Sequence, residues 1–317
     1  MRIVITGALG HIGSRFIRGM VPGEFTDVVL LDNLATQRYC SLFDLPAGVP
    51  FRFREADVCT ADLAAEFAGM DAVIHLAAIT NPAGSFEMQD QMERVNCTGT
   101  ERVALACAAA GCPLVFVSST SVYNVPQETV TEDCVIDERK PQSPYADSKL
   151  RSEQLLTALG EEGKLQFITC RFGTIYGVSP GMRFHTAINK FTWQACMCQP
   201  LSVWSTALHQ RRPYLDLGDA VRALRLILQR RQFDNRIYNV VSENLTVAEV
   251  LEQLRKHVPA CQVGLVDSVA MNQLSYAVSN ERFRGLGFEF NGELSRAIGD
   301  TVALLQQSHA GRPVPAP

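Results

Sequence analysis

Short apolar runs alternate with longer amphipathic stretches through the first half of the chain. The runs predict β-strands over Arg2–Thr6, Val28–Leu31, Phe51–Arg54, Ala72–His75, Leu114–Ser118 and Phe167–Arg171. The stretches between them predict helices over Ile12–Met20, Ala61–Ala68, Met88–Ala110 and Pro144–Leu159. This alternation is typical of an α/β fold with a doubly wound parallel sheet. Because the strands are apolar without alternation, we expect them to be buried on both faces.

The pattern becomes less regular after Gly177. Helical periodicity returns at Gly218–Gln229 and Thr246–His257, and the second stretch opens on a capping-box pattern, Thr246 followed by Glu249. We therefore predict a first domain over residues 1–177 and a smaller C-terminal α/β lobe, mainly residues 178–310, interleaved with the last strands of the sheet. The proline-rich residues 311–317 predict a disordered tail.

Composition narrows the class of protein. The chain has 317 residues, a formal net charge of −4 and 47% hydrophobic residues, the balance of a soluble globular protein. It contains no dense basic run, which argues against a nucleic-acid groove or an anionic membrane surface as partner. The most apolar stretch, Val103–Val117, is interrupted by Gly111 and Pro113 and is too short to span a bilayer. Because the chain opens on a strand pattern, not a signal peptide, we expect a cytoplasmic protein.

The ten cysteines show no Cys-x-x-Cys spacing, and the six histidines are scattered. Most of the cysteines lie in apolar segments, so we expect them to be reduced, buried and structural, with no metal site. The alternating pair Cys196 and Cys198 is the alternative candidate for a site.

A glycine-rich turn follows the first predicted strand. The segment Gly7-Ala8-Leu9-Gly10-His11-Ile12-Gly13 places three glycines between a strand and a helix. Such a turn lets the backbone approach a pyrophosphate, and the following helix offers free N–H groups and the positive end of its dipole to the phosphates. Its position at the start of a βαβ unit favours a dinucleotide-binding site.

The second predicted strand is followed by Asp32 and Asn33. A carboxylate there can accept hydrogen bonds from both ribose hydroxyls of adenosine and would repel a 2′-phosphate, which favours NAD over NADP. Arg38 is close to Asp32 in the sequence and could instead bind a 2′-phosphate. The alternative interpretation of Asp32 is a simple turn cap.

Tyr145 and Lys149 lie four residues apart in a predicted helix, which places both side chains on one face. Ser143 and Pro144 before them are typical of an N-cap and a first helical residue. The helix N-terminus and the ammonium group would both lower the pKa of the Tyr145 phenol, making it a general base for a secondary alcohol. The alternative interpretation is an exposed helix face.

Hydroxyl residues follow the strand at Leu114–Ser118. Ligands of such sheets bind at the carboxyl ends of the strands, so Ser118 and Ser119 are expected to emerge there. Ser119 can then hydrogen-bond the oxygen that gains or loses a proton. For Thr120 and Ser121 a role in capping the turn is the better interpretation.

Taken together, these motifs resemble the extended short-chain dehydrogenase/reductases of the NAD-dependent epimerase/dehydratase kind, over about residues 1–290. The matching segments are GALGHIG, Asp32, Asp57-Val58, His75-Leu76-Ala77-Ala78, Asn96, SSTSVY, YADSK and Arg212-Pro213-Tyr214. The resemblance implies a Rossmann domain that binds NAD, and a C-terminal lobe that binds the substrate.

The resemblance also assigns roles to individual residues. It implies a catalytic set of Ser119, Tyr145 and Lys149. The cofactor is expected to contact Gly7, Gly10, His11, Ile12, Gly13, Asp32, Asn33, Asp57, Val58, Leu76, Ala77, Ala78, Asn96, Ser118, Tyr145, Lys149 and Phe172. The sugar substrate is expected to contact Thr80, Ser119, Thr174, Asn189 and Arg212.

Several positions depart from the family pattern. Thr174 stands where relatives have an asparagine that touches the substrate diphosphate, and the second diphosphate-binding arginine, expected around Met271–Tyr276, is missing. The loop before Arg212 also lacks its usual glycines. The Thr-Asp-Glu of the 4,6-dehydratases is replaced by Ser119-Thr120-Ser121, which disfavours elimination of water.

The leading hypothesis is therefore an NAD-dependent epimerase of a nucleotide-linked sugar, acting at C4 through a transient ketone. A dehydrogenase or ketoreductase with net hydride transfer uses the same residues and is the alternative. A non-catalytic NAD-binding regulatory protein is an alternative of another class. The resemblance further implies a homodimer, formed by Met88–Ala110 and the helix that contains Tyr145.

Overall fold

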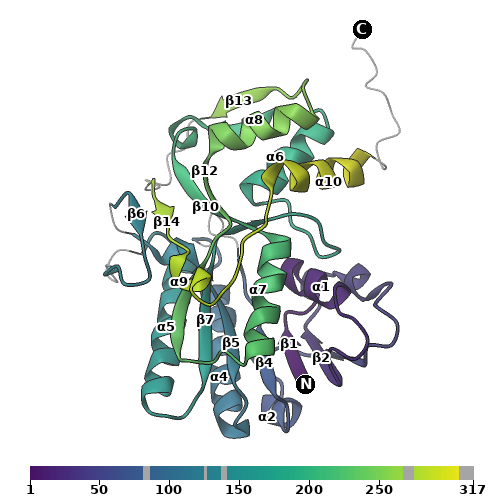
Figure 1. Cartoon of the computed structure of the whole chain (residues 1–317), viewed down its shortest axis with the longest axis vertical. Coiled ribbons are helices and arrows are strands. Elements are labelled where there is room, and N and C mark those ends of the chain that lie inside the picture. Colours follow the sequence, from purple (N-terminus) through teal and green to yellow (C-terminus); the bar gives the residue numbers. More distant parts are fainter. Residues whose placement is uncertain (81–85, 125–126, 137–140, 267–274, 307–317) are drawn as a thin grey trace.

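A seven-stranded parallel sheet forms the centre of the computed structural model, which describes residues 1–80, 86–124, 127–136, 141–266 and 275–306 (Figure 1). Its strands lie in the order β11-β7-β5-β4-β1-β2-β3. They are β1 (Arg2–Thr6), β2 (Asp27–Asp32), β3 (Phe51–Glu55), β4 (Ala72–His75), β5 (Leu114–Ser119), β7 (Phe167–Phe172) and β11 (Arg236–Val240). The doubly wound α/β sheet is thus confirmed, and the chain order reverses between β1 and β4, where such sheets bind ligands.

The edge strand β3 corrects one expectation. Its sequence, Phe-Arg-Phe-Arg-Glu, alternates, and its residues are half-buried or exposed. The reason is its place at the end of the sheet, where one side has no neighbouring strand. By contrast, β1 and β2 lie inside the sheet, and Val4 and Val29 are completely buried.

Helices cover both faces of the sheet. On one face, α1 (His11–Arg18) packs beside α7 (Leu217–Arg230), and both contribute to one apolar core with alternate residues of the strands. On the other face, α2 (Leu63–Phe67), α4 (Gly99–Ala110) and α5 (Pro144–Glu161) form a second core. The sheet is therefore sandwiched between two helical layers, as predicted (Figure 1).

The helix predicted over Met88–Ala110 is confirmed over residues 89–110, and its middle turns are wider than those of an α-helix. The chain forms α3 (Gln89–Met92), then a π-helical segment, Glu93–Thr98, and then α4. Wider turns of this kind are frequent at functional sites. This segment carries Asn96, whose side chain is buried and bonded to the loop after β4.

A smaller α/β lobe lies above the sheet in Figure 1. Its strands are β8 (Thr174–Tyr176), β10 (Arg211–Asp216) and β12 (Glu243–Thr246), in the order β12-β10-β8, and the parallel pair β9 (Leu201–Trp204) and β13 (Val263–Val266). Its helices α6 (Ala187–Cys196), α8 (Val247–His257) and α10 (Leu294–Gln306) surround a third core. Short elements complete the chain: β6 (Thr129–Val130) paired with β14 (Ala277–Val278), and α9 (Glu281–Arg284).

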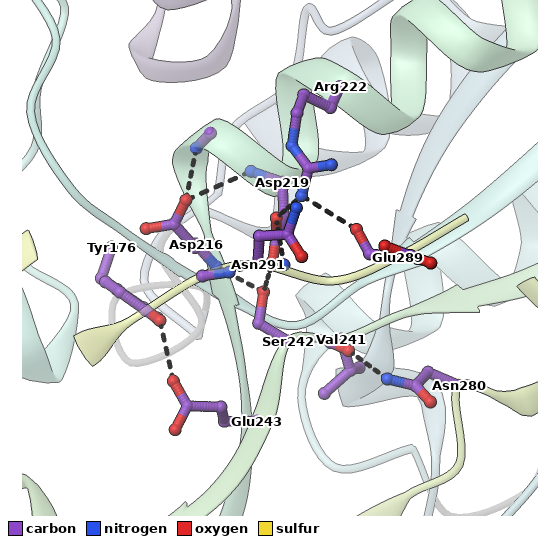
Figure 2. Close-up of polar contacts among 12 residues, drawn as sticks. Tyr176, Asp216, Asp219, Arg222, Val241, Ser242, Glu243, Asn280, Glu289 and Asn291 are labelled. Atoms are coloured by element: carbon purple, nitrogen blue, oxygen red, sulfur yellow. Dashed lines mark hydrogen bonds and ion pairs between the residues drawn. The ribbon is translucent and has the colours of Figure 1, made fainter. Parts of the chain in front are cut away.

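The two parts of the chain are joined by buried carboxylates. Asp216 caps α7 by accepting hydrogen bonds from the amides of Gly218 and Asp219. The Asp219 carboxylate accepts a hydrogen bond of 2.6 Å from the Ser242 hydroxyl and bonds from the backbone of residues 291 and 292 (Figure 2). These contacts hold the segment leading to α10 against the start of α7. The capping box of Thr246 and Glu249 at the start of α8 is confirmed.

The cysteines are less uniform than expected. All ten are free, but burial is restricted to Cys107, Cys112, Cys170 and Cys196, while Cys40 and Cys198 are exposed. Cys198 therefore does not share the environment of Cys196, and the described residues contain no cluster of three or more His, Cys, Asp or Glu side chains that could hold a metal. Within the same residues, every helix is too short or too polar to cross a bilayer. The tail predicted at 311–317 lies outside the described residues.

Candidate active site

A groove at the carboxyl ends of the central strands holds two adjoining cavities. The first, here the Tyr145 cavity, is lined by Gly7, Gly10, His11, Ile12, Leu76, Ala78, Thr80, Val117, Ser118, Ser119, Tyr145, Lys149, Phe172, Gly173, Thr174, Ile175, Arg183, His185 and Thr186. The second, here the Asp32 cavity, is lined by Gly7, Gly10, Asp32, Asn33, Ala35, Thr36, Arg38, Ala56, Asp57, Val58, Leu76, Ala77, Ala78, Ile79, Gln91, Arg94, Val95 and Arg183. The predicted cofactor and catalytic residues thus meet in one groove, with two exceptions described below.

The glycine turn borders both cavities. Gly7 has a φ of +65°, and a Cβ there would lie 2.6 Å from the backbone nitrogen of Ala77, so only glycine fits. Gly10 precedes α1 without a side-chain cap from the described residues, and His11 and Ile12 of the first turn line the Tyr145 cavity. Gly13 is one of the two exceptions, because it packs against Ala8 and lines neither cavity. The turn therefore fits a pyrophosphate.

Asp32 does two things at the end of β2. One oxygen accepts a hydrogen bond of 3.0 Å from the Leu9 amide, and the other accepts one of 3.0 Å from the Leu34 amide. The turn-capping interpretation is therefore correct in part, while the carboxylate also lines the Asp32 cavity. The Arg38 guanidinium lines it too, and the charge of Asp32 opposes the fall that burial causes in the pKa of Arg38.

Asn96 is the second exception. It lines neither cavity, but its amide oxygen accepts a 2.8 Å bond from the Ile79 amide, and its nitrogen donates to the Ile79 carbonyl at 3.0 Å and to the Ser148 hydroxyl at 3.1 Å. It therefore ties the loop that carries Leu76–Thr80 to helix α5. Its contribution to the cofactor site is to position that loop.

Tyr145 and Lys149 come from the first two turns of α5. The Ser143 hydroxyl caps the helix by accepting a 3.1 Å bond from the Ala146 amide, and Pro144 occupies the first turn, as predicted. Tyr145 is 7% exposed and forms a hydrogen bond with Ser119. Lys149 is buried, and its ammonium donates at 2.9 Å to the carbonyl of Val117 on β5. The exposed-face interpretation of this helix is therefore wrong.

The pKa of Tyr145 corrects a second expectation. Burial raises the pKa of the phenol, while the hydrogen bond from Ser119 and the charge of Arg183 act in the opposite direction. Lys149 does not contribute as predicted, because its hydrogen bond goes to the backbone. Burial also lowers the pKa of Lys149 to about 8, while the negative charge of the Glu153 carboxylate acts in the opposite direction.

A buried ion pair supports the floor of this site. Glu153 on α5 is paired with Arg171 on β7 at 2.6 Å and accepts a 2.5 Å hydrogen bond from the Ser118 hydroxyl. Both charged side chains are about 97% shielded from solvent, with 4% and 3% of their surfaces exposed. The network fixes the end of β5, and with it Ser118 and Ser119, relative to α5.

Among the predicted substrate residues, Thr80, Ser119 and Thr174 line the Tyr145 cavity. Asn189 and Arg212 line neither cavity. Asn189 is buried and donates a 2.9 Å hydrogen bond to the Arg183 carbonyl. Arg212 donates to Gln210 at 2.9 Å, and its guanidinium lies 5.8 Å from the Tyr276 ring centre. Their contact with a substrate remains a prediction.

Comparison with known proteins identifies the family. The family model "NAD dependent epimerase/dehydratase family" matches residues 3–240. The chain belongs to this family. An uncharacterised UDP-glucose epimerase of Bacillus subtilis is 28% identical over 249 residues, 76% of each chain. A dTDP-glucose 4,6-dehydratase of Streptomyces niveus is 29% identical over 265 residues, 81% of this chain and 77% of its own.

Solved structures agree on the fold. The UDP-glucose 4-epimerase of Thermus thermophilus, in complex with NAD, is 26% identical and superimposes with a TM-score of 0.79 over 96% of this chain and 99% of its own. The resemblance to extended short-chain dehydrogenase/reductases is thereby confirmed, and so is the Rossmann-type sheet. Relatives include both epimerases and dehydratases, so similarity alone leaves the reaction open between these two.

Two residues that line the groove of this epimerase/dehydratase family member were not predicted from the sequence. Arg183 lines both cavities, and His185 lines the Tyr145 cavity. They lie between β8 and α6, in a segment that also contains Gly177 and Gly181. The sequence did contain a signal for them, because both are basic residues in a glycine-containing segment that directly follows a strand. The sequence does not show, however, which wall of the groove such a segment reaches.

Proposed function

We propose that this protein is an NAD-dependent epimerase that inverts C4 of a nucleotide-linked sugar. The observation that carries the proposal is the Tyr145 cavity itself. It brings the Ser119 hydroxyl, the Tyr145 phenol and the Lys149 ammonium together, and no Asp or Glu occurs among the described residues that line it. Proton transfer and hydride exchange at a carbinol carbon need the first three groups and no carboxylate.

The groove fits NAD. The glycine turn suits a pyrophosphate, Asp32 with Asn33, Asp57 and Val58 offers a polar site for adenosine, and the Tyr145 cavity adjoins the same turn. The nicotinamide of a bound NAD would accept a hydride from the sugar and return it. Asp32 would accept hydrogen bonds from the adenosine ribose, and its negative charge disfavours the 2′-phosphate of NADP.

Three side chains of this chain take part in the reaction. Tyr145 removes the proton of the C4 hydroxyl while the C–H electron pair leaves as hydride, so the alcohol becomes a ketone. Ser119 donates a hydrogen bond to the same oxygen and stabilises the charge that develops there. Lys149, whose ammonium donates to the Val117 carbonyl, would hold the ribose next to the nicotinamide. When hydride returns to the other face of the ketone, Tyr145 gives the proton back, and net oxidation is zero.

Epimerisation is favoured over dehydration by the same lining. Elimination of water needs an acid that protonates the leaving hydroxyl and a base that removes a carbon-bound proton. Ser121, which stands where the dehydratases have glutamate, donates a 2.9 Å hydrogen bond to Ser119 and supplies neither. The Tyr145 cavity therefore supports oxidation and reduction at one carbon better than loss of water from two.

The test is incubation of the purified protein with UDP- and dTDP-hexoses in D2O, followed by NMR. The proposal expects a mixture of C4 epimers, no deuterium at C4, and no accumulation of NADH. Accumulating NADH would identify the net dehydrogenase, and a 4-keto-6-deoxy sugar the dehydratase. Bound NAD without turnover of any sugar would favour the regulatory alternative.

A further inference from the structure

The two cavities meet at the glycine turn, and one charged residue faces both. Their shared lining consists of Gly7, Gly10, Leu76, Ala78 and Arg183. The first four come from the nucleotide-binding domain, while Arg183 comes from residues 177–186, here called the strap, which connect β8 to α6. A dinucleotide with adenosine in the Asp32 cavity and nicotinamide in the Tyr145 cavity has its pyrophosphate at this junction.

The strap lies directly against the glycine turn. The Gly181 amide donates a 2.9 Å hydrogen bond to the Ser14 hydroxyl on α1. A Cβ on Gly181 would lie 2.4 Å from the Leu9 carbonyl oxygen and 2.6 Å from that of Gly10, closer than any side chain tolerates. The strap can therefore approach the turn this closely only with glycine at this position.

Further contacts fix the strap on either side of Gly181. The Ser179 hydroxyl lies 2.7 Å from His11 Nδ1, the first residue of α1. Asn189, buried on α6, accepts a hydrogen bond from the Gly177 amide at 3.3 Å and donates one to the Arg183 carbonyl at 2.9 Å. The strap is thus held from both the nucleotide-binding domain and the second lobe, and Asn189 holds the Arg183 carbonyl directly.

The Arg183 side chain is a cation without an acidic partner among the described residues. Its guanidinium donates to the Thr80 hydroxyl, and none of the ion pairs formed within that part of the chain includes it. Burial and the neighbouring charge of Arg38 together lower the pKa of Arg183 to about 10, although the charges of Tyr145 and Asp32 act in the opposite direction. A half-buried cation beside a second cation is stabilised when an anion enters the groove.

We infer that Arg183 binds the pyrophosphate of NAD from the side opposite the glycine turn, so that the second lobe holds the cofactor in place. The planar guanidinium can donate two parallel hydrogen bonds to phosphate oxygens. The inference rests on the proposed NAD-dependent function and deepens it. An enzyme that returns its hydride in every cycle gains from a cofactor that does not leave between the two half-reactions.

Cofactor binding by Arg183→Met tests this directly. Affinities for NAD, ADP-ribose and adenosine are measured by titration calorimetry or by competition on nucleotide-free protein, and retained NAD is measured in the protein as purified. We expect binding of NAD and ADP-ribose to weaken about ten- to a hundredfold, because both carry the pyrophosphate, and adenosine binding to stay unchanged. Arg255→Met, which removes an exposed arginine at the end of α8, is the control and should bind all three ligands like the wild type.

A second variant separates the strap from the charge. Gly181→Ala keeps Arg183 but pushes the strap away from the turn, so it should show the same loss for NAD and ADP-ribose with adenosine spared. Unchanged NAD affinity in Arg183→Met overturns the inference, as does an equal loss for adenosine, or a loss confined to sugar-nucleotide binding. Arg183-dependent NAD binding without epimerisation contradicts only the proposed reaction, whereas a wild type that binds no NAD contradicts both.

Discussion

The reactivity of Tyr145 depends on how far a buried phenol can ionise. Spacing alone predicts that Lys149 lowers its pKa, but burial raises it and the ammonium hydrogen-bonds Val117. Ser119 and the positive charge of Arg183 favour the phenolate. An oxidised nicotinamide ring is also positively charged, so we expect ionisation to be favoured only in the loaded enzyme. The base is thereby active when the hydride acceptor is present.

Tyr145→Phe tests the base. We expect turnover to fall by about a hundred- to ten-thousandfold, the usual contribution of a general base, while NAD stays bound because the ring still fills its place. Epimer interconversion and NAD content are measured on the same preparation. Tyr39→Phe, at a tyrosine that is 53% exposed, is the matched control. Turnover within tenfold of wild type in Tyr145→Phe would rule out the proposed role.

Asp32→Asn tests the choice of cofactor. The amide keeps a similar shape and one acceptor oxygen but removes the charge that repels a 2′-phosphate, and Arg38 in the same cavity is left to attract it. We expect the ratio of the NADP to the NAD dissociation constant to fall about tenfold or more. The ratio is insensitive to a general loss of folding. Asp27→Asn, at the other end of β2, should leave it unchanged, and an unchanged ratio in Asp32→Asn would refute the assignment.

At the scale of elements, buried polar side chains form hydrogen bonds between the strands and helices that surround the groove. His75 at the end of β4 bonds the Thr6 hydroxyl on β1 at 2.7 Å and the Thr100 hydroxyl on α4 at 3.0 Å. Burial, together with the charge of Lys149, lowers the pKa of His75 to about 3. The imidazole therefore stays neutral in the folded protein at pH values where the unfolded chain binds a proton.

Acid stability follows from this difference. Below pH 6.5 the unfolded state takes up a proton that folded His75 does not, so the free energy of unfolding falls by about 1.4 kcal/mol per pH unit between pH 6 and 4 from this group. We expect His75→Gln to lose that part of the slope in denaturant unfolding of the apoprotein. His209→Gln, which removes an exposed imidazole, should keep the wild-type slope. Equal slopes for His75→Gln and wild type would contradict the prediction.

At the scale of the whole molecule, the second lobe is not a separate unit added to the sheet. Strand β11 follows several elements of that lobe and returns to pair with β7, and the strap reaches back to the glycine turn. The groove is therefore built from both parts of the chain.

Apolar side chains also remain exposed on the helices expected to form a dimer, with Leu105 on α4 48% exposed and Phe86 near α3 54% exposed.

The homodimer is tested at Leu105. We expect the wild type to sediment as a dimer, and Leu105→Glu as a monomer, because a buried unpaired carboxylate in a helical interface costs several kcal/mol. Leu304→Glu on α10, where the leucine is 46% exposed, is the control and should remain dimeric. A monomeric wild type, or a dimeric Leu105→Glu variant, would show that this face is not the interface.

The elements could be predicted from the sequence because their causes are local. The strands are apolar runs, the caps at Ser143 and Thr246 are short-range hydrogen bonds, and the glycine turn has a fixed spacing. Predictions failed where distant partners decide the outcome. An edge position exposes β3, and burial raises the pKa of Tyr145, where the spacing to Lys149 predicts a lower one.

By itself, the sequence determined the parallel sheet and the turn that suits a pyrophosphate, since each depends on residues close together along the chain. The resemblance to a family predicted Ser119, Tyr145 and Lys149 as the catalytic set, and the fold places all three in one cavity. Only the tertiary structure decided which groups lie opposite each other across the groove. Arg183 lies 170 residues beyond Gly13, the last glycine of the turn, yet the close approach of Gly181 to Gly10 brings the two together. Charge and burial act through space, and their effect is therefore settled only when the chain has folded.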